Sequence, residues 1–319
     1  MSRRRVLVTG GAGFIGSHVA DAYLARGDEV WIVDDLSSGK RENVPAEAKF
    51  IEMDISDPAL EDVFRDAGGF DIVNHHAAQM DVRRSVADPR FDARVNIDGL
   101  LNVLELARRF ETRRVLFVSS GGVVYGEPEV MPTPESAPKL PLSPYGVTKL
   151  AAEFYLHYYR RVHGLESVAL RYSNVYGPRQ DPHGEAGVVA IFSTRLINGE
   201  ALTIYGDGEQ TRDYIYVGDV VAANMLLSDA PLGDGAGLDA HSFNVGTGIE
   251  TSVNQLARAM MAAVGREVEI RYAPARPGEL LRSCLDASRL RALGWAPRTS
   301  LGDGLNETYR YIAGRGTTR

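Results

Sequence analysis

The N-terminal segment Val6–Ser17 constrains the fold most strongly, because it joins a strand, a glycine-rich turn and a helix. Apolar residues 6–8 predict a buried strand, and the amphipathic run after the turn predicts a helix. The glycines of the turn are Gly10, Gly13 and Gly16. They let the chain turn tightly and let a pyrophosphate approach the backbone, while the helix start offers free N–H groups and a positive dipole end. We therefore expect a dinucleotide here, with its phosphates beside Phe14 and Ile15.

An acidic residue, Asp34, follows the second predicted strand at the spacing of about 20 residues that this fingerprint requires. Its carboxylate can accept hydrogen bonds from both ribose hydroxyls and would repel a 2'-phosphate, so we expect NAD rather than NADP. The adjoining residues expected to line the same cofactor site are Asp35, Ser37, Ser38 and Gly39. The alternative for Asp34 is a turn-capping aspartate.

Strand-like and helix-like segments alternate through the first half of the chain, which is typical of a parallel sheet with helices on both faces. Strands are predicted over Val6–Val8, Val30–Val33, Phe50–Met53, Ile72–Asn74, Val115–Val118 and Ser167–Leu170. Helices are predicted over Phe14–Ala25, Leu60–Ala67, Val95–Arg108 and Tyr145–Val162. We therefore predict an α/β fold with a Rossmann-type doubly wound sheet. Beyond Arg171 the pattern becomes less regular, as expected for a smaller carboxy-terminal α/β domain placed over the strand ends.

Ligands of such sheets bind at the carboxyl ends of the strands, so the residues after each strand are candidates for the site. Asp54 and Ile55 follow the third strand and could hydrogen-bond and cover an adenine, with capping of the next turn as the alternative. After the fourth strand, the small residues Ala77 and Ala78 let a flat cofactor lie close, and Gln79 follows them. We expect these five residues to contact the cofactor.

A tyrosine and a lysine four residues apart, Tyr145 and Lys149, share one face of a predicted helix. A neighbouring ammonium favours a phenolate and so lowers the pKa of a tyrosine, which turns a weak acid into a usable general base near neutral pH. Ser119 or Ser120, at the end of the fifth strand, can supply a hydroxyl that orients a sugar oxygen or the phenol. This set predicts proton transfer beside the cofactor.

Composition excludes several other functions. The formal net charge of −7, from 35 basic and 42 acidic residues, argues against nucleic-acid binding as the main activity. The single cysteine, Cys284, excludes an internal disulfide or a cysteine-based zinc site, and adjacent His75 and His76 would face opposite sides of a strand, so we expect no metal. Residues 3–5 run into a strand without an apolar signal region, and no 18-residue apolar stretch occurs, so we expect no membrane contact and a cytoplasmic protein.

Together these motifs resemble the extended short-chain dehydrogenase/reductase family, and within it the NAD-dependent nucleotide-sugar epimerases. The resemblance rests on Gly10-x-x-Gly13-x-x-Gly16, Asp34, His76-Ala77-Ala78-Gln79, Asn96, Tyr145-x-x-x-Lys149 and the run Arg171–Gln180. It covers essentially the whole chain. It implies a NAD-binding Rossmann domain of residues 1–171 plus about 218–246, and a nucleotide-sugar-binding domain of about 172–217 plus 247–319.

The resemblance also implies roles for individual residues. Further NAD contacts are implied for Asn96, Ser119, Tyr145, Lys149 and Tyr172. For the substrate, it implies a diphosphate bound by Arg212 and Arg276, whose guanidinium forks suit this anion, and a uridine ribose bound by Glu279, where the family usually has Asp. The remaining implied substrate contacts are Ser120, Tyr145, Asn174, Gly187, Val188, Thr203, Tyr205 and, near the sugar C2 substituent, Ser283.

One departure affects the catalytic hydroxyl. The family usually places Ser or Thr four residues before the tyrosine of its Val-Tyr-Gly motif, and here that residue is Gly121. A subset of relatives carries Ser or Thr followed by Gly-Gly, so we assign the hydroxyl to Ser120, with Tyr145 and Lys149 completing the catalytic set. Dehydratases and decarboxylases of the superfamily add an acid just after the hydroxyl residue, because they need another acid/base group, and residues 121–124 contain none.

The resemblance therefore implies NAD-dependent 4-epimerisation of a UDP-sugar by transient oxidation at C4 and return of the hydride. UDP-glucose and UDP-galactose are the expected substrates, and Ser283 extends the expectation to the N-acetylated pair because serine leaves room that a tyrosine would fill. The alternatives are another nucleotide-sugar enzyme of the same family (a UDP-glucuronate epimerase, a dehydratase or a reductase) and a non-catalytic NAD-responsive binding protein.

Two predicted helices carry more apolar surface than one sheet face needs. The apolar residues are Leu100, Leu101 and Leu104 on one helix and Phe154, Tyr155, Tyr158 and Tyr159 on the other. Pairing these helices across a twofold axis would bury the surplus in an isologous interface, so we expect a homodimer. The alternative is that both helices simply pack on the sheet.

Overall fold

Seven parallel strands form the central sheet of the computed structural model, which describes residues 3–181, 187–275 and 280–316. The strands are β1 (Arg5–Thr9), β2 (Glu29–Asp34), β3 (Lys49–Glu52), β4 (Ile72–His75), β5 (Arg114–Ser120), β6 (Glu166–Tyr172) and β11 (Ser242–Val245). Their order is β11-β6-β5-β4-β1-β2-β3, so the chain runs outward to one side of β1 and then to the other. This topology confirms the predicted Rossmann-type doubly wound sheet.

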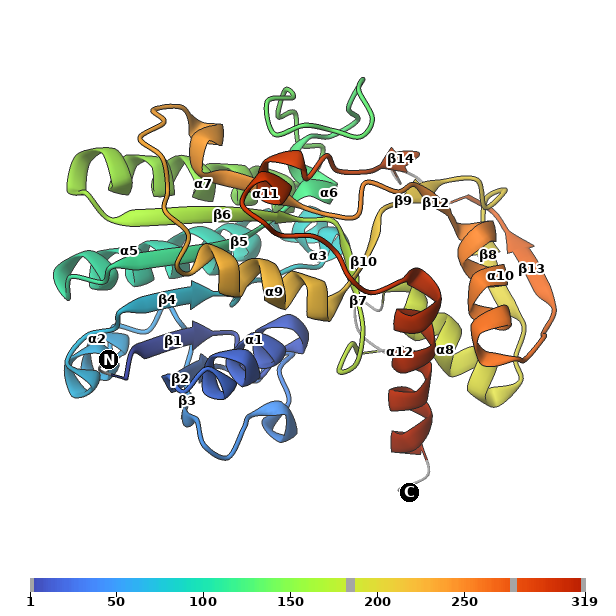
Figure 1. The fold of residues 1–319 in the computed structure, drawn as a ribbon, viewed down its shortest axis with the longest axis horizontal. Coiled ribbons are helices and arrows are strands. Elements are labelled where there is room, and N and C mark those ends of the chain that lie inside the picture. The colour runs from blue at the N-terminus through green and yellow to red at the C-terminus, as the bar shows by residue number, and fades with distance from the viewer. Residues whose placement is uncertain (1–2, 182–186, 276–279, 317–319) are drawn as a thin grey trace.

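Helices cover both faces of this sheet (Figure 1). One face packs against α2 (Leu60–Ala67), α5 (Gly99–Arg109) and α7 (Pro144–His163), and the other against α1 (Phe14–Ala25), α9 (Val217–Leu227) and α11 (Ser288–Ala292). Successive strand residues point to opposite faces, so Leu7 joins the first apolar cluster while Val6 and Val8 join the second. The near-continuous apolar strands of the sequence reflect this burial on both sides.

The helix expected over Val95–Arg108 begins earlier than predicted. After the short helix α3 (Val82–Ala87), helix α4 (Pro89–Ala93) leads through a π-helical turn, η2 (Arg94–Asp98), into α5. The Asp88 side chain accepts a hydrogen bond from the Phe91 N–H, and Pro89 occupies the first helical turn. These are ordinary helix-start signals, and the apolar periodicity that begins only after them led the prediction to place the start too late.

The rest of the chain builds a third apolar cluster beside the strand ends, at the right of Figure 1. Its helices are α8 (Val188–Asn198), α10 (Val253–Val264) and α12 (Leu301–Gly316). Its paired strands are β7 (Asn174–Tyr176) with β10 (Tyr214–Tyr216), β8 (Leu202–Tyr205) with β13 (Ile270–Ala273), and β9 (Thr211–Arg212) between β12 (Thr251–Ser252) and β14 (Arg282–Ser283). The short elements α6 (Gly121–Val124), η1 (Arg41–Asn43) and η3 (Leu238–His241) complete the described fold. Within the described ranges, no helix combines the length and apolar character needed to cross a membrane.

Candidate active site

The glycine-rich turn and the segment after β4 meet where the strand order reverses, because β1 lies between β2 and β4. Gly10 has φ +66°, and a Cβ on it would lie 2.6 Å from the Ala77 nitrogen. Only glycine therefore permits this close approach. A Cβ on Gly16 would similarly collide with the Gly10 carbonyl oxygen, so the third glycine lets α1 pack against the turn. The crevice at such a reversal is where doubly wound sheets bind their ligands.

The start of α1 faces this crevice without a side-chain cap. Its N-cap residue is Gly13, and Phe14 and Ile15 form the first helical positions. Phosphates bind at such termini because the first backbone N–H groups of a helix have no partner within the helix. The predicted phosphate site at Phe14 and Ile15 is thus available in the fold.

Asp34 lies beside the turn at the end of β2 and is 6% exposed. Its carboxylate accepts hydrogen bonds from the backbone N–H groups of Ala12 and Leu36, both at 2.9 Å. Burial raises the pKa of Asp34, and these two bonds oppose the shift. Gly39 packs directly on the carboxylate, because a Cβ there would lie 2.6 Å from Oδ1. The turn-capping role that sequence left open is therefore real, and the remaining lone pairs of both oxygens can still accept ribose hydroxyls.

Other predicted cofactor residues lie around this crevice with their side chains already engaged. Asp35 accepts hydrogen bonds from the Ser37 N–H and hydroxyl in an exposed turn, and Ser38 is exposed beside it. Asp54 caps the turn at Ser56 in the same way, and the Ile55 side chain is buried in the core. The capping alternative therefore applies to Asp54 Oδ1, and the expected adenine contact at residues 54 and 55 stays a prediction.

Asn96 fixes the segment that follows β4. The Gln79 N–H donates to Asn96 Oδ1 at 2.9 Å, and Asn96 Nδ2 donates back to the Gln79 carbonyl at the same distance. Asn96 lies in the π-helical turn η2, and such irregular helical turns occur frequently at functional sites. Asn96 thus fixes the main chain at Gln79, at the end of the segment that carries Ala77 and Ala78.

Two buried polar atoms without a partner lie just beyond strand ends, His76 Nε2 after β4 and Ser173 Oγ after β6. Buried polar groups are normally hydrogen-bonded, so such atoms at a ligand crevice indicate groups that a ligand would satisfy. Together with the glycine turn and Asp34, they fit a bound dinucleotide. The resemblance also implied a cofactor contact at Tyr172, directly before Ser173. The Tyr172 ring packs in the core and its hydroxyl accepts from Asn224 Nδ2.

Tyr145 and Lys149 lie in the first turns of α7, which Ser143 caps by accepting a hydrogen bond from the Gly146 N–H. Lys149 Nζ lies 5.7 Å from the centre of the Tyr145 ring and 4.8 Å from that of Phe117. The Lys149 ammonium donates to the Val118 carbonyl at 2.8 Å. The structure therefore brings the two predicted residues together at the end of β5.

Burial lowers the pKa of Lys149 to about 8, and the negative charges of Asp92 and Glu153 oppose this shift. A buried ammonium that titrates near neutral pH is typical of a site that transfers protons. Of the two candidate serines, Ser119 donates its hydroxyl to Glu153 Oε1 at 2.6 Å and is fully enclosed, whereas Ser120 is partly exposed. Neighbouring strand residues face opposite sides, so the Ser120 hydroxyl is directed away from the buried Ser119 and Glu153 hydrogen bond.

Leu285 explains the glycine at position 121. A Cβ built on Gly121 would collide with the Leu285 side chain, which is 1% exposed and packs with Val124 and Tyr125. A serine or threonine at position 121 would therefore require the Leu285 side chain to shift. The departure from the family pattern is thus coupled to a residue far along the chain.

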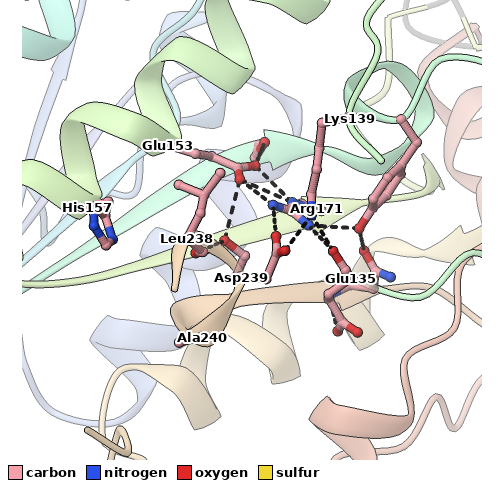
Figure 2. A network of polar contacts seen from close by, with 12 residues as sticks. Glu135, Lys139, Glu153, His157, Arg171, Leu238, Asp239 and Ala240 are labelled. Atoms are coloured by element: carbon pink, nitrogen blue, oxygen red, sulfur yellow. Dashed lines mark hydrogen bonds and ion pairs between the residues drawn. The ribbon is translucent and has the colours of Figure 1, made fainter. Parts of the chain in front are cut away.

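A buried network of charges lies behind the site, as Figure 2 shows. Arg171 is 0% exposed and forms an ion pair with Glu153, which is 1% exposed, through Nη2 at 2.5 Å and Nε at 3.0 Å. Arg171 also pairs with Asp239 at 2.8 Å, and Lys139 pairs with the same Asp239. Arg171 Nη1 donates to the Tyr125 hydroxyl at 2.9 Å. The network joins α7, β6 and the loop after β5, and sequence analysis had given neither Arg171 nor Glu153 a role.

The predicted substrate residues lie in the second half of the chain. Arg212 and Ser283 are register partners on β9 and β14, and Ser283 is buried. Thr203 on β8 accepts a hydrogen bond from Arg195 on α8, and Tyr205 ends β8. Asn174 is exposed at the start of β7, and Gly187 caps α8 directly before Val188. Arg276 and Glu279 lie outside the described residues.

Within residues 3–181, 187–275 and 280–316, no group of three or more histidine, cysteine, aspartate or glutamate side chains is placed to bind a metal ion.

The chemistry that the arrangement supports is proton transfer by Tyr145 and Lys149 next to a dinucleotide crevice.

Comparison with known proteins gives this geometry a context. Residues 6–246 match the family described as the NAD dependent epimerase/dehydratase family. The UDP-glucose 4-epimerase of Thermotoga maritima, solved with UDP-glucose, is 46% identical, with a TM-score of 0.92 over 99% of this chain and 100% of that one. The Thermus thermophilus UDP-glucose 4-epimerase, solved with NAD, is 45% identical, with a TM-score of 0.89 over 97% and 99% of the two chains.

A third solved structure has a different substrate in its name. The UDP-N-acetylglucosamine 4-epimerase of Methanobrevibacter ruminantium, in complex with UDP-N-acetylmuramic acid, is 37% identical to this chain. The TM-score is 0.91 over 99% of this chain and 100% of that one. Each of the three matches covers at least 97% of this chain.

Proposed function

The chain belongs to the NAD dependent epimerase/dehydratase family, and from this premise we propose that it interconverts UDP-sugars that differ in configuration at C4. The observation that carries the proposal is the buried Lys149 ammonium against Tyr145, at the edge of the NAD crevice. Residues 121–124, directly after Ser120, contain no carboxylate and so do not supply the additional acid/base group that dehydration needs. The solved relatives named for UDP-glucose 4-epimerase support the same reaction.

Asp34 and the glycine turn would hold NAD, which when bound would supply the hydride chemistry at C4. Tyr145 takes the proton of the C4 hydroxyl as the C4–H bond breaks. Lys149 stabilises the phenolate that makes this possible, and Ser120 donates a hydrogen bond to the C4 oxygen. The 4-keto sugar then turns within its site, and Tyr145 returns the proton when the hydride adds to the opposite face.

The two halves of the chain divide the binding. Residues 1–171 plus about 218–246 form the NAD-binding domain. Two contacts support the inclusion of residues 218–246, because β11 pairs with β6 in the large sheet and α9 packs on α1. Residues of about 172–217 plus 247–319 bind the nucleotide sugar, with Arg212 and Arg276 at the diphosphate. Most of these segments surround the third apolar cluster, whereas α11 and Trp295 pack on the large sheet. The lone cysteine, Cys284, is buried and free, which suits a cytoplasmic protein.

The purified protein incubated with UDP-galactose and no added cofactor tests the function. We expect UDP-glucose to accumulate to equilibrium, with no net change in the amount of NAD, as measured by chromatography of the sugars and absorbance of the cofactor. Stoichiometric conversion of NAD, or an ultraviolet-absorbing dehydrated sugar, would instead indicate a reductase or a dehydratase.

Ser283 sets the range of sugars that the site accepts. Its neighbours Leu281 and Arg282 are exposed, Arg282 pairs with Glu250, and Ser283 faces inward beside Arg212. We expect the protein to epimerise UDP-N-acetylglucosamine as well as UDP-glucose. The variant Ser283→Tyr should lower kcat/KM for the acetylated sugar by roughly 10–200-fold, because losing fit in a small pocket typically costs about 1–3 kcal/mol.

The same measurement on UDP-glucose provides the comparison within each variant. Ser283→Ala is the matched control, since it removes the hydroxyl without adding bulk, and it should accept both sugars. Retention of both sugars by Ser283→Tyr would show that another wall of the pocket limits the substrate.

We expect a homodimer formed through α7. Leu100, Leu104 and Tyr159 are buried against the sheet, so part of the predicted apolar surplus was assigned wrongly. Phe154 and Tyr158 remain 56% and 47% exposed, and Tyr155 and Val162 continue the same helix face. Light scattering at micromolar concentration should give the dimer mass. Tyr158→Ala should raise the dimer dissociation constant by roughly 30-fold, the effect of losing a central contact of about 2 kcal/mol.

The control for the dimer is Val130→Ala, which shortens another exposed apolar side chain, in the loop between β5 and α7. It should leave the dissociation constant unchanged. A monomer mass for the native chain would contradict the prediction directly.

A further inference from the structure

Asp92 is a carboxylate that the mechanism above does not use, and it is 0% exposed on α4. Three side chains donate hydrogen bonds to it. Gln79 Nε2 and Asn96 Nδ2 donate to Oδ1 at 2.8 and 3.1 Å, and Thr148 Oγ1 donates to Oδ2 at 2.8 Å. All three donors are neutral. The carboxylate therefore lies between the cofactor segment after β4 and the catalytic helix α7.

No ion pair compensates this charge within the part of the chain that the structure describes. The contrast with Glu153 is clear, because that carboxylate receives the guanidinium of Arg171 directly. Taking an unpaired carboxylate out of water is costly, and three neutral hydrogen bonds recover only part of the cost. A fold that retains such a charge beside an active site indicates that the charge serves the site.

The cation that experiences the charge is Lys149, which follows Thr148 on α7. Several groups face Lys149 from the elements packed around it. They are Tyr145 and Glu153 on α7, His75 and His76 at the end of β4, the Phe117 ring and Val118 carbonyl on β5, and Asp92 on α4. Both histidines are held neutral, since burial and Lys149 lower their pKa values to about 3. The charge of Glu153 is offset by Arg171, so Asp92 is the uncompensated anion of this group.

We propose that Asp92 is a positioning residue of this active site: its uncompensated charge keeps Lys149 in the ammonium form, and its hydrogen bonds fix the cofactor segment at Gln79 to the catalytic helix at Thr148. The inference rests on the proposed function, because it assigns Asp92 to the same Tyr145 and Lys149 chemistry. Asp92 reaches the reaction only through Lys149 and does not itself contact the reacting atoms.

The composition of the chain makes the charge state of Lys149 directly measurable. The chain has four lysines, Lys40, Lys49, Lys139 and Lys149. NMR of protein labelled at the lysine side chains therefore gives four resonances, and the loss of one in Lys149→Met assigns Lys149. Following its chemical shift against pH gives the midpoint of its titration without any turnover.

We expect the Lys149 midpoint in Asp92→Asn to fall by about one pH unit or more, because removing a nearby opposite charge disfavours the ammonium. The alkaline limb of kcat/KM for UDP-galactose should move down by the same amount, since activity is lost as pH rises through the pKa of Lys149. A purely structural role for Asp92 would lower kcat/KM at every pH and leave both positions unchanged.

Two variants control for hydrogen bonding. Thr148→Val removes one donor but keeps the charge, and it should leave the Lys149 midpoint in place. Asp92→Ser, which leaves room for water at the donors, is the second neutral variant and should show the same fall if Asp92→Asn does not fold. An unchanged midpoint in a folded neutral variant overturns the inference. Failure of the native protein to epimerise any UDP-sugar rejects the proposed function instead, so the two failures are distinguishable.

Discussion

Tyr145→Phe is expected to lower kcat for UDP-galactose epimerisation by roughly 10²–10⁴-fold, the contribution typical of a positioned general base. Phenylalanine keeps the ring beside Lys149, which lies 5.7 Å from its centre, and removes only the oxygen that accepts the proton. UDP should therefore bind with unchanged affinity, as calorimetry can measure. A fall in kcat at constant UDP affinity would assign Tyr145 to the chemical step.

The control is Tyr155→Phe, which removes a phenol oxygen from the same helix at a partly exposed position away from Lys149. It should retain native turnover. Epimerisation by Tyr145→Phe at near-native rates would remove the residue from the mechanism and, with it, the need for an ammonium at Lys149.

The parts of the fold that sequence predicted best are those where local signals and burial agree. The helices α1 and α2 have the predicted bounds, and all six predicted strands are present, because each combines a strong apolar pattern with glycine or polar ends. Strand β11 was not predicted. It has four buried residues, Ser242–Val245, and its identity depends on pairing with β6, which no local pattern reveals.

The parts of the site that lie within one short sequence motif were predictable from the sequence. The glycine turn, Asp34 and the Tyr145 and Lys149 pair each lie within a local pattern, and the fold brings them to one edge of the sheet. Gly121 shows the limit, because the reason for this glycine is the Leu285 side chain that occupies the adjacent space. Such a contact joins residues that lie far apart in sequence.

Buried charges were missed for a related reason. Arg171 is the penultimate residue of the apolar strand β6, and Glu153 follows Lys149 by one helical turn, so both were visible as charges in segments expected to be buried. That pattern signals a paired charge, since an isolated one would be too costly in the core. A single sequence does not identify the ion-pair partner of Arg171, because any of several acidic residues could have paired with it.

The Arg171 and Glu153 pair is expected to give the largest stability effect in the chain. Arg171→Met should lower the free energy of unfolding by about 3–5 kcal/mol, because it leaves the Glu153 carboxylate buried without its ion-pair partner. Urea unfolding at fixed protein concentration and saturating NAD measures the loss. Arg113→Met, at an arginine whose contact to Asp229 is exposed, is the matched control and should cost about 0–1 kcal/mol.

The double variant Arg171→Met with Glu153→Gln separates the cost of an orphaned charge from the value of the pair itself. An amide oxygen at position 153 can still accept from Ser119, and Asp239 keeps its ion pair with Lys139. The double variant should therefore recover most of the stability that the single variant loses, because replacing both members of a buried pair is often nearly neutral. A double variant as unstable as Arg171→Met would show that the guanidinium stabilises the fold through its hydrogen bonds to Tyr125 and the Glu135 carbonyl, independently of the charge on Glu153.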